Sequence, residues 1–247
     1  MHLKQFIKSL IPAPLLDPLL EKRDRMYVAR QARMTPGEIF SEVYRRKVWG
    51  GKDRDFFSGY GSHMTEAVDA YVEALKPVFA DHPNATVVDL GCGDFNIGIK
   101  IRPLCGCYIA CDIVPDLIER NKRKFSDSNV DFRCLDITTD AIPSGDIVLV
   151  RQVLQHLNNQ QIANFIKMIG GCSVLVLTEH LPSGPFISNK DKPAGAGIRL
   201  HGSTPSGIVL TDAPFNLKYD SASVLASVDI GQGRLETTYY YRPYVDG

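Results

Sequence analysis

The residues best suited to chemistry lie in the segment VVDLGCG, residues 87–93. An apolar run ends at Asp89, and Gly91 and Gly93 form the turn that follows it. Glycine has no side chain, so the backbone of such a turn can approach a ligand closely. Ligands of open α/β sheets bind at these strand ends. The segment therefore predicts a ligand site around Asp89, Gly91 and Gly93.

Two classes of ligand compete for this turn. A dinucleotide site has the pattern G-x-G-x-x-G, but the sequence from Gly91 is GCGDFN, with Asn96 at the third glycine position. Asp94 would also bring a negative charge next to a pyrophosphate. S-adenosylmethionine carries a sulfonium cation and an ammonium group, which Asp89 and Asp94 suit. The turn therefore favours S-adenosylmethionine over NAD.

Two further acids end the next apolar runs. Asp112 ends YIACD, and an acid about 20 residues after the glycine turn can accept hydrogen bonds from ribose hydroxyls. Asp136 ends VDFRCLD, where a carboxylate could accept from an adenine amino group with Ile137 against the ring. Any one of these aspartates could instead cap a helix or a turn. Acids at three successive strand ends indicate a single site.

A parallel sheet would bring these residues together. After residue 84, apolar runs alternate with helical patterns, which predicts an α/β fold with helices on both faces of a mainly parallel sheet. Strands are expected at 86–90, 108–112, 130–136, 146–151 and 173–179. The segments SVLASVDI and RLETTYYYR, separated by GQG, predict a closing antiparallel hairpin.

The chain before residue 84 has helical patterns on both sides of the loop VWGGKDRDFFSGYGS. We expect an N-terminal helical cap and lid segment over 1–62 and a cofactor-binding domain over 63–247. The glycines of SGYGS permit hinge motion, so Tyr60 and Gly61 could close over the cofactor. The alternative is an ordinary flexible linker.

Composition narrows the class of protein. The 247 residues carry 28 basic and 28 acidic side chains and are 44% hydrophobic, which is typical of a globular protein and gives no charge argument for nucleic-acid binding. No apolar run is long enough to span a bilayer, and the first 20 residues lack a signal-peptide cleavage site. That segment could pack on the domain or a partner, or touch a membrane peripherally. The six cysteines form no CxxC pair, so we expect reduced thiols, no metal site and a cytoplasmic protein.

Together these motifs resemble those of the class I S-adenosylmethionine-dependent methyltransferases. VVDLGCG resembles their first motif, CDIVPDLIERN the second-strand acidic motif, FRCLDIT the adenine-contacting segment and DIVLVRQVLQHL the fourth-strand motif that faces the methyl donor. The resemblance covers residues 60 to 245 and implies a Rossmann-like, seven-stranded fold. From this resemblance and from the glycine turn and the SGYGS loop, we expect twelve cofactor contacts. They are Asp89, Gly91, Gly93, Asp94, Asp112, Ile113, Asp136, Ile137, Arg151, Gln152, Tyr60 and Gly61.

One subgroup of this family resembles the chain more closely, through Tyr44, Trp49-Gly50, SGYGS and the C-terminal segments NKDKPAGAGIR and SGIVLTDAPFNL. Some of its members are encoded near surface-polysaccharide genes. This resemblance implies a saccharide or a saccharide-lipid as the methyl acceptor.

Methyl transfer needs a base only when the acceptor loses a proton, as a hydroxyl does. His156 is the first candidate and His180 the second, although either histidine could simply pack or cap a helix. Glu179 could orient a base or bind an amine. The long loop 181–220 is the expected acceptor wall, with Asn189, Asp191, Arg199, Phe186 and Phe215 as contacts, and His201 is a weaker candidate.

The preferred function is methyl transfer to a hydroxyl of a small polar acceptor. One alternative is N-methylation of an amine metabolite or of RNA. Another is a non-catalytic binding module with the same fold. The sequence RQVL stands where many amino-directed enzymes carry Asn/Asp-Pro-Pro-aromatic, which weakens amino groups of bases as targets.

Overall fold

The computed structural model describes residues 34–170, 172–200 and 204–242. The chain divides into two units, Met1–Thr35 and Pro36–Gly247. Nearly all of the first unit lies outside the described residues, and so do the proposed N-terminal contact segment and His201. The second unit carries all the elements described below.

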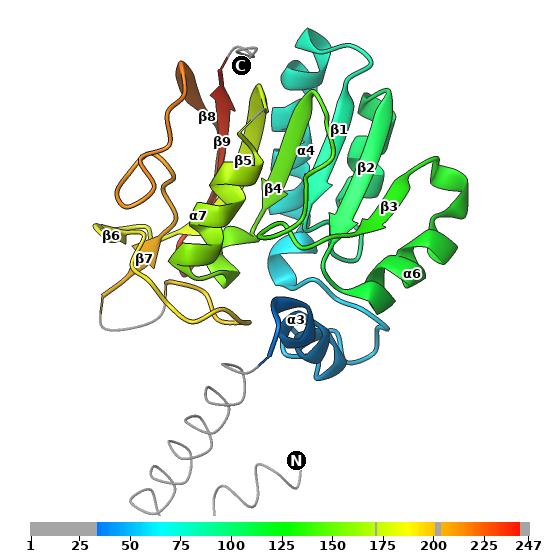
Figure 1. Cartoon of the computed structure of the whole chain (residues 1–247), viewed down its shortest axis with the longest axis horizontal. Helices are drawn as coiled ribbons and strands as arrows, with labels where there is room; N and C mark the ends of the chain where they lie inside the picture. Colours follow the sequence, from blue (N-terminus) through cyan, green and yellow to red (C-terminus); the bar gives the residue numbers. More distant parts are fainter. Residues whose placement is uncertain (1–33, 171, 201–203, 243–247) are drawn as a thin grey trace, which may run out of the picture. The chain divides into compact units, whose positions relative to one another are not determined.

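A seven-stranded sheet forms the centre of this unit, in the order β3-β2-β1-β4-β5-β9-β8 (Figure 1). The first five strands are parallel, and β9 runs antiparallel between β5 and β8. The strands are β1 (Thr86–Leu90), β2 (Cys107–Asp112), β3 (Asp131–Cys134), β4 (Ile147–Arg151), β5 (Val174–Leu181), β8 (Ser221–Asp229) and β9 (Arg234–Tyr241). The predicted α/β fold with a closing antiparallel hairpin is confirmed.

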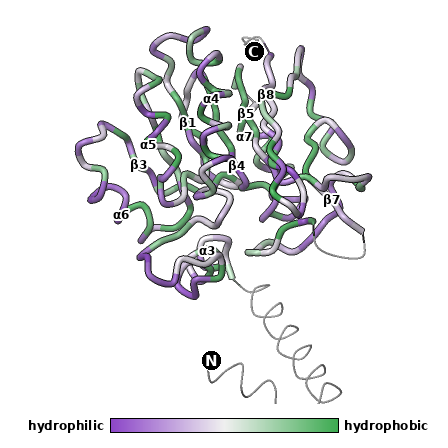
Figure 2. Tube along the Cα trace, turned by 180° about the vertical axis from the view of Figure 1, so that it is seen from behind, coloured by the Kyte–Doolittle hydropathy of each residue, from purple (hydrophilic) through white to green (hydrophobic). Residues whose placement is uncertain are grey.

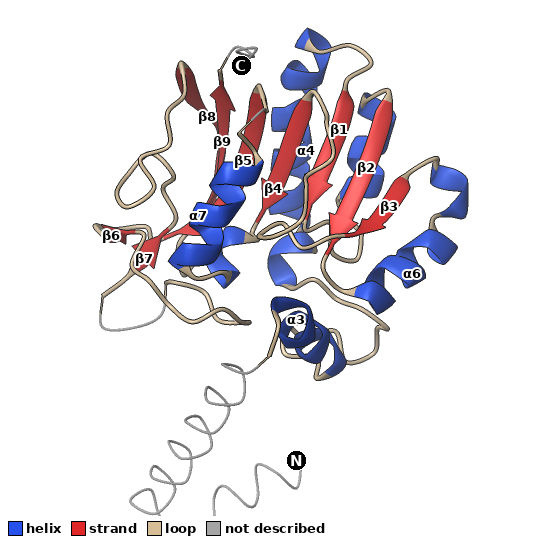
Figure 3. Ribbon diagram, in the orientation of Figure 1, coloured by secondary structure: helices blue, strands red, loops and turns tan. Residues whose placement is uncertain are grey.

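Helices cover both faces of the sheet, with α7 in front of it and α4 behind it in Figure 1. They are α3 (Pro36–Arg45), α4 (Thr65–Asp81), α5 (Gly98–Ile101), α6 (Pro115–Lys124) and α7 (Asn159–Met168). Short 3₁₀ turns are η1 (Tyr60–Ser62), η2 (Arg102–Leu104), η3 (Ser126–Ser128) and η4 (Leu154–His156). A separate two-stranded ribbon, β6 (Ile187–Ser188) with β7 (Ser206–Gly207), lies beside the main sheet (Figure 3).

Two hydrophobic clusters, one on each face, explain why the strand sequences are almost continuously apolar. Val88 and Leu90 pack with residues of α3 and α7 on one face, whereas Val87 packs with α4 on the other. A strand with helices on both sides must bury both sets of alternating side chains. Figure 2 shows hydrophobic residues concentrated along these central strands.

Local signals in the sequence set the helix ends. Pro115 begins α6, and Lys122, Arg123 and Lys124 occupy its last turn, where cations suit the helix dipole. Asn158 and Gln161 form a reciprocal capping box at the start of α7. The segment NIGIKIRPL forms only the single turn α5, followed directly by the 3₁₀ turn η2, which contains Pro103 near its start.

None of the described helices combines the length and the apolarity that crossing a bilayer requires. The described residues also contain no group of three metal-ligating side chains. All six cysteines are free thiols.

Candidate functional site

A cavity of about 460 Å³ opens where the five parallel strands end. This volume is in the range of small-molecule sites. Every parallel strand contributes to the lining: Gly91 after β1, Asp112 in β2, Asp136 after β3, Arg151 in β4 and His180 in β5. The cavity therefore lies at the carboxyl edge of the sheet, where a parallel sheet is expected to bind its ligand.

The glycine turn forms part of the cavity wall. Gly91 and Gly93 have φ angles of +81° and +55°, which favour glycine. A Cβ on Gly91 would lie 2.3 Å from Cγ2 of Val153, and one on Gly93 would lie 2.3 Å from Oγ of Ser58. Side chains are therefore excluded at both positions by backbone conformation and by space.

Asp112 fixes this turn and also faces the cavity. Its carboxylate accepts the backbone N–H of Gly93 at 3.0 Å and that of Val114 at 3.1 Å. Burial raises the pKa of Asp112 to about 6, against these hydrogen bonds, which lower it. A carboxylate has about four acceptor positions, so Asp112 can accept further hydrogen bonds from a ligand.

A second part of the cavity is mainly apolar. Ile113, Leu135 and Ile137 line it next to Asp136. The Oδ1 atom of Asp136 accepts the backbone N–H and the hydroxyl of Thr138 at 2.8 and 2.7 Å. Apolar side chains beside one fixed carboxylate can hold a flat ring that carries an amino group.

Arg151 is a partly buried cation at the end of β4. Its Nη1 donates to Oε1 of Gln152 at 2.8 Å, and its Nη2 donates to the carbonyl of Gly61 at 2.9 Å. Its Nε has no hydrogen-bond partner among the described residues, and its guanidinium lies 5.2 Å from the ring centre of Tyr71. Arg151 is therefore suited to hold a carboxylate group of a ligand.

Two of the predicted acids face other protein groups. Asp89 and Asp94 do not line the cavity formed by the described residues. Asp89 accepts the hydroxyl of Tyr108 at 2.9 Å, and burial raises the pKa of Asp89 to about 7. Oδ2 of Asp94 lies 2.7 Å from Nε2 of His63 and accepts the backbone N–H of Ser58 at 3.2 Å. Direct contact of these two acids with a cofactor stays a prediction.

The segment Ser58–Ser62, which we call the lid segment, covers the glycine turn. Tyr60 and Gly61 line the cavity. Oγ of Ser58 lies 2.9 Å from the hydroxyl of Tyr44 and accepts the backbone N–H of Asp94 at 2.7 Å. The lid segment is therefore tied to the glycine turn by specific hydrogen bonds.

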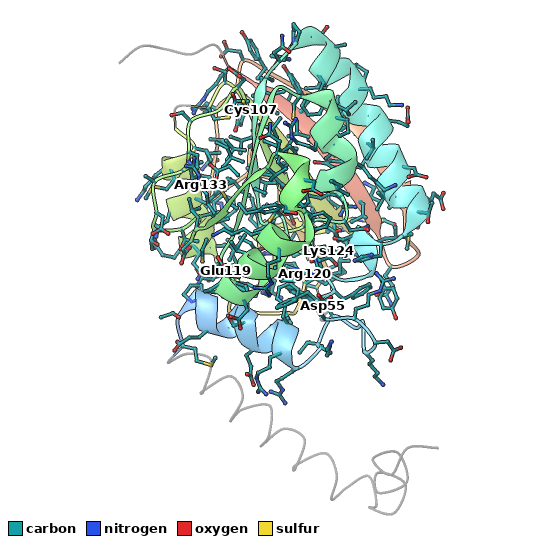
Figure 4. The ribbon with its side chains drawn as sticks, turned by 90° about the vertical axis from the view of Figure 1, so that its right-hand side faces the viewer. Asp55, Cys107, Glu119, Arg120, Lys124 and Arg133 are labelled. Atoms are coloured by element: carbon teal, nitrogen blue, oxygen red, sulfur yellow. The ribbon has the colours of Figure 1, made fainter. Side chains whose placement is uncertain are left out.

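The loop that precedes the lid segment is tied to α6. Arg120 donates from Nε to a carboxylate oxygen of Asp55 at 2.9 Å and from Nη1 to the carbonyl of Asp94 at 3.1 Å. Figure 4 shows Asp55 and Arg120 close together at the lower edge of α6. Arg120 therefore connects the loop, α6 and the glycine turn.

An aromatic wall, formed by Phe40, Tyr44, Trp49 and His156, closes another side of the cavity. The ring centres of Trp49 and His156 are 5.0 Å apart, and those of Trp49 and Tyr44 are 5.2 Å apart. Nε1 of Trp49 donates to the carbonyl of Ala196 at 3.3 Å. The wall therefore joins α3, the loop after it, η4 and the long C-terminal loop.

His156 is neutral at pH 7. Burial and, to a lesser extent, the charge of Lys192 lower its pKa to about 4. Its Nδ1 has no hydrogen-bond partner among the described residues. His180 lines the same cavity together with Ile230 and Gln232 from the turn between β8 and β9. Both predicted histidines therefore share one cavity with the predicted cofactor residues other than Asp89 and Asp94.

Residues 87–172 match a family described as "Methyltransferase domain", and they run from β1 to just before β5. The chain contains a methyltransferase domain. No curated protein is significantly similar to the methyltransferase in sequence.

Solved structures share the fold of the methyltransferase at low sequence identity. Magnesium protoporphyrin IX methyltransferase from Synechocystis PCC 6803, with bound S-adenosylhomocysteine, has a TM-score of 0.57 at 14% identity, over 85% of this chain and 100% of that chain. The DhpI complex with S-adenosylhomocysteine has a TM-score of 0.53 at 18% identity, with the same coverage of both chains. N-methyltransferase NodS from Bradyrhizobium japonicum WM9 has a TM-score of 0.51 at 13% identity, over 72% and 88%.

The long C-terminal loop of the methyltransferase lines the cavity with residues other than those expected to contact an acceptor. Of the long C-terminal loop, Ala196, Gly197 and Ile198 reach the cavity. The expected contacts Phe186, Phe215, Asn189, Asp191 and Arg199 are not among its lining residues in the described part of the chain. Asn189, for example, donates its side-chain amide to the carbonyl of Val209 at 2.8 Å.

Phe40 of α3 was not predicted from the sequence as part of the site. In the sequence, Phe40 is only one of several apolar residues of a helical pattern. Tyr44 and Trp49 stand out only through the subgroup resemblance. Their position on the cavity follows from the packing of α3 against the sheet, which no local pattern encodes.

Proposed function

We propose that this methyltransferase transfers the methyl group of S-adenosylmethionine to a hydroxyl of a small uncharged acceptor, with a saccharide or saccharide-lipid as the first class to test. The observation that carries the proposal is the neutral His156, which lies on the same cavity as the residues suited to the cofactor. The resemblance to the subgroup with Tyr44, Trp49 and SGYGS supports a saccharide.

The cavity residues fit the cofactor group by group. Asp112 would accept the ribose hydroxyls, Asp136 and Ile137 would hold the adenine, and Arg151 would pair with the methionine carboxylate. Gly91 and Gly93 carry no side chains, so the cofactor can approach the protein backbone closely at this turn. When bound, S-adenosylmethionine supplies an electrophilic methyl group on its sulfonium.

His156 would accept the proton that the acceptor hydroxyl loses. A histidine with a pKa of about 4 is in its basic form throughout the physiological range, so the residue is always ready to accept. The same low pKa makes it a weak base, and holding donor and acceptor in line must therefore supply much of the acceleration. His180 is the second candidate for this role.

The distribution of charge supports an uncharged acceptor. Apart from the two histidines, the charged side chains that line the cavity in the described part of the chain are Asp112, Asp136 and Arg151. The proposal assigns all three to the cofactor. The rest of the lining formed by the described residues carries no carboxylate, lysine or arginine and includes the aromatic wall, and aromatic rings offer apolar faces on which the C–H face of a sugar ring can lie.

Two alternatives make different predictions. An N-methyltransferase acting on an amine metabolite or RNA would methylate amines and not hydroxyls. A non-catalytic module would bind the cofactor and transfer nothing.

The proposal includes three further expectations from the sequence. Residues 1–62 serve as cap and lid, the N-terminal segment can contact a membrane peripherally, and the protein acts in the cytoplasm.

The first experiment compares thermal unfolding with S-adenosylmethionine, S-adenosylhomocysteine and NAD. A ligand at about 100 times its Kd stabilises by about 2.7 kcal/mol, which raises the Tm by a few degrees in a domain of this size. We expect this rise with both adenosyl compounds and none with NAD. Transfer of a radiolabelled methyl group to neutral glycosides, phenols, amines and RNA then identifies the acceptor class, and transfer only to amines or RNA would contradict the proposal.

Replacing His156 tests the base. General base catalysis contributes about 100- to 10,000-fold, so His156→Ala should lower kcat by at least 100-fold for a hydroxyl acceptor. The Kd of S-adenosylhomocysteine should stay within about 2-fold. His82→Ala is the matched control, because His82 bonds the carbonyl of Val78 and does not line the cavity. Full activity of His156→Ala would exclude His156 as the base.

A further inference from the structure

The turn that carries Gln155 and His156 is held from one side by a buried acid. Glu179 of β5 accepts the backbone N–H of Leu154 at 2.9 Å and that of Gln155 at 3.1 Å. The two bonds use different carboxylate oxygens, and Glu179 is only 2% exposed. The Glu179 side chain therefore binds both backbone N–H groups at the start of the turn.

A buried arginine holds the carbonyl groups of the same turn. Nη1 of Arg199 donates to the carbonyls of Gln155 and Leu157 at 3.1 and 2.9 Å, with that of Leu154 at 3.5 Å. Nη2 donates to the side chain of Asn159 at 2.9 Å. Arg199 is 5% exposed and comes from the long C-terminal loop, 45 positions further along the chain than Leu154.

This arrangement is costly, because two ionisable groups lose their hydration. Burial raises the pKa of Glu179 to about 8, against the bonds from the turn and the charge of Arg199, which lower it. Buried charges are tolerated only where hydrogen bonds satisfy them, and replacing them with apolar groups is often neutral or stabilising. A short turn could be held by apolar packing alone, so stability does not account for the pair.

The two side chains that the turn carries into the cavity indicate a role for Glu179 and Arg199. Gln155 and His156 both line the cavity, and Oε1 of Gln155 and Nδ1 of His156 have no hydrogen-bond partner among the described residues. Nε2 of Gln155 does bond the carbonyl of Gln152 at 3.3 Å and Nε2 of His156 at 3.4 Å. Because these bonds lead only to the turn itself and to the segment just before it, the positions of both side chains depend on the backbone of the turn.

We propose that Glu179 and Arg199 are positioning residues that clamp the 154–157 turn and thereby set the positions of Gln155 and His156 in the acceptor part of the cavity. This inference rests on the proposed function, because it takes His156 as the group that meets the acceptor. It gives the long C-terminal loop a second task, besides the wall residues Ala196–Ile198.

Trp49 supplies a direct readout. It is the only tryptophan of the chain, and its ring centre lies 5.0 Å from that of His156. Displacement of the turn would separate the rings and admit water, so quenching of Trp49 fluorescence by acrylamide should rise. The imidazole C–H shifts of His156, assigned by comparison with His156→Ala, give a second readout by NMR.

The test compares Arg199→Met, Arg199→Lys and Glu179→Gln with Arg102→Met. Arg102 also donates to backbone carbonyls, those of Asn129 and Cys105, but does not line the cavity. We expect both Arg199 variants to raise the quenching constant of Trp49 about 2-fold or more. The Arg102 variant should lower the Tm without changing Trp49 fluorescence. The Kd of S-adenosylhomocysteine should stay within about 3-fold in all four variants.

Arg199→Lys is the decisive variant for His156. The charge of Arg199 itself lowers the pKa of His156, so its removal in Arg199→Met shifts the titration whether or not the turn moves. Lysine keeps the charge but lacks the planar fork that reaches several carbonyls. In the wild type, the His156 shifts should be constant between pH 8 and pH 5.5, and in Arg199→Lys they should titrate toward the ordinary pKa of about 6.5.

Wild-type quenching and wild-type His156 shifts in Arg199→Lys and Glu179→Gln would overturn the clamp, even if the Tm fell. Should Arg199→Met fail to fold, these two milder variants carry the test. The spectroscopic readouts need no acceptor, so they separate the two proposals. Failure of hydroxyl methylation in the acceptor panel would remove the proposed function, whereas unchanged spectra would remove the clamp.

Discussion

Asp112 shows how one residue can serve both the fold and the ligand. Its carboxylate holds the glycine turn through two backbone N–H groups and lines the cavity at the same time. Because burial raises its pKa to about 6, the residue is close to protonation at mildly acidic pH. Its ligand-binding capacity therefore depends on pH.

Asp112→Asn should weaken binding of S-adenosylhomocysteine by about 10- to 100-fold, because a hydrogen bond to a charged group contributes about 1.5–3 kcal/mol. In the wild type, affinity should fall as the pH falls through about 6, since the protonated carboxyl loses acceptor capacity. Titration calorimetry between pH 5.5 and pH 8 measures both effects. Asp127→Asn, at an exposed aspartate remote from the cavity, is the control, and an equal loss in it would contradict the assignment.

The aspartates near the glycine turn differ in how well the sequence predicts their surroundings. The glycine turn, Asp112 and Asp136 were predicted because a strand end places such residues at the edge of the sheet. Asp89 and Asp94 were also read as facing the cofactor. Their observed partners, Tyr108 and His63, lie 19 and 31 positions away in the chain, and no local pattern could reveal those pairs.

At the scale of elements, the lid segment differs in character from a simple hinge. Its glycines suggested mobility, yet Ser58 bonds both α3 and the glycine turn through Tyr44 and Asp94. In addition, Nδ2 of Asn96 donates to the carbonyl of Ser62 at 2.8 Å. Opening of the segment therefore requires these bonds to break, and they should slow the escape of a bound cofactor.

Ser58→Ala should accelerate the release of S-adenosylhomocysteine, because the variant removes the hydroxyl that joins Tyr44 to Asp94 and leaves the chain volume nearly unchanged. Loss of about 1 kcal/mol of hydrogen bonding corresponds to roughly a 5-fold faster dissociation. Stopped-flow displacement measures the rate. Ser128→Ala is the control, since Ser128 bonds the carbonyl of Phe125 away from the cavity. A dissociation rate equal to that of the control would mean that the segment does not retain the ligand.

The long C-terminal loop was expected to be functional because a compact domain seldom contains so long a stretch without regular structure. That expectation named side chains that point elsewhere. Arg199 donates to the backbone carbonyl of Gln155 in η4, and Asp191 accepts the backbone N–H of Asn159 at 2.8 Å. The length of the loop was informative, whereas the direction of each side chain depends on contacts with η4 and α7.

For the whole molecule, the alternation of strands and helices was enough to predict the sheet and its closing hairpin. Burial on both faces makes the strands almost continuously apolar, and that pattern is visible in the sequence. The placement of α3 was not predictable in the same way. Its apolar face packs into the same cluster as the central strands, but an amphipathic helix does not specify which surface it covers.

The buried acids predict how stability depends on pH. Burial raises the pKa values of Asp89, Asp112 and Glu179 to about 7, 6 and 8, above those of the unfolded chain. These acids therefore bind protons more strongly in the folded protein, and the free energy of unfolding should rise as the pH falls from 8.5 to 6.5. Lys192 opposes this rise near its upper end, because burial lowers its folded pKa to about 8, but it is one group against three. Below 6.5, protonation of His156 in the unfolded chain opposes this trend, because its folded pKa is about 4.

Urea denaturation of the protein without ligand at pH 8.5, 7.5 and 6.5 measures this dependence. Glu179→Gln removes the group with the highest of the three pKa values, so its free energy of unfolding should change less over this range. A wild-type stability that falls steadily from pH 8.5 to pH 6.5 would show that the three acids are not buried as described.

The insertion of β9 between β5 and β8 has a consequence for synthesis on the ribosome. β5 is buried along its whole length in the finished sheet, yet its hydrogen-bonding partner on that side is Arg234–Tyr241. While the chain emerges, the cavity-forming strands β1 to β5 can assemble before that partner has been translated. The nascent chain then presents an apolar strand with an unpaired edge, which favours pairing with other chains. Chaperone binding to this edge during translation would prevent such pairing until β9 is released from the exit tunnel.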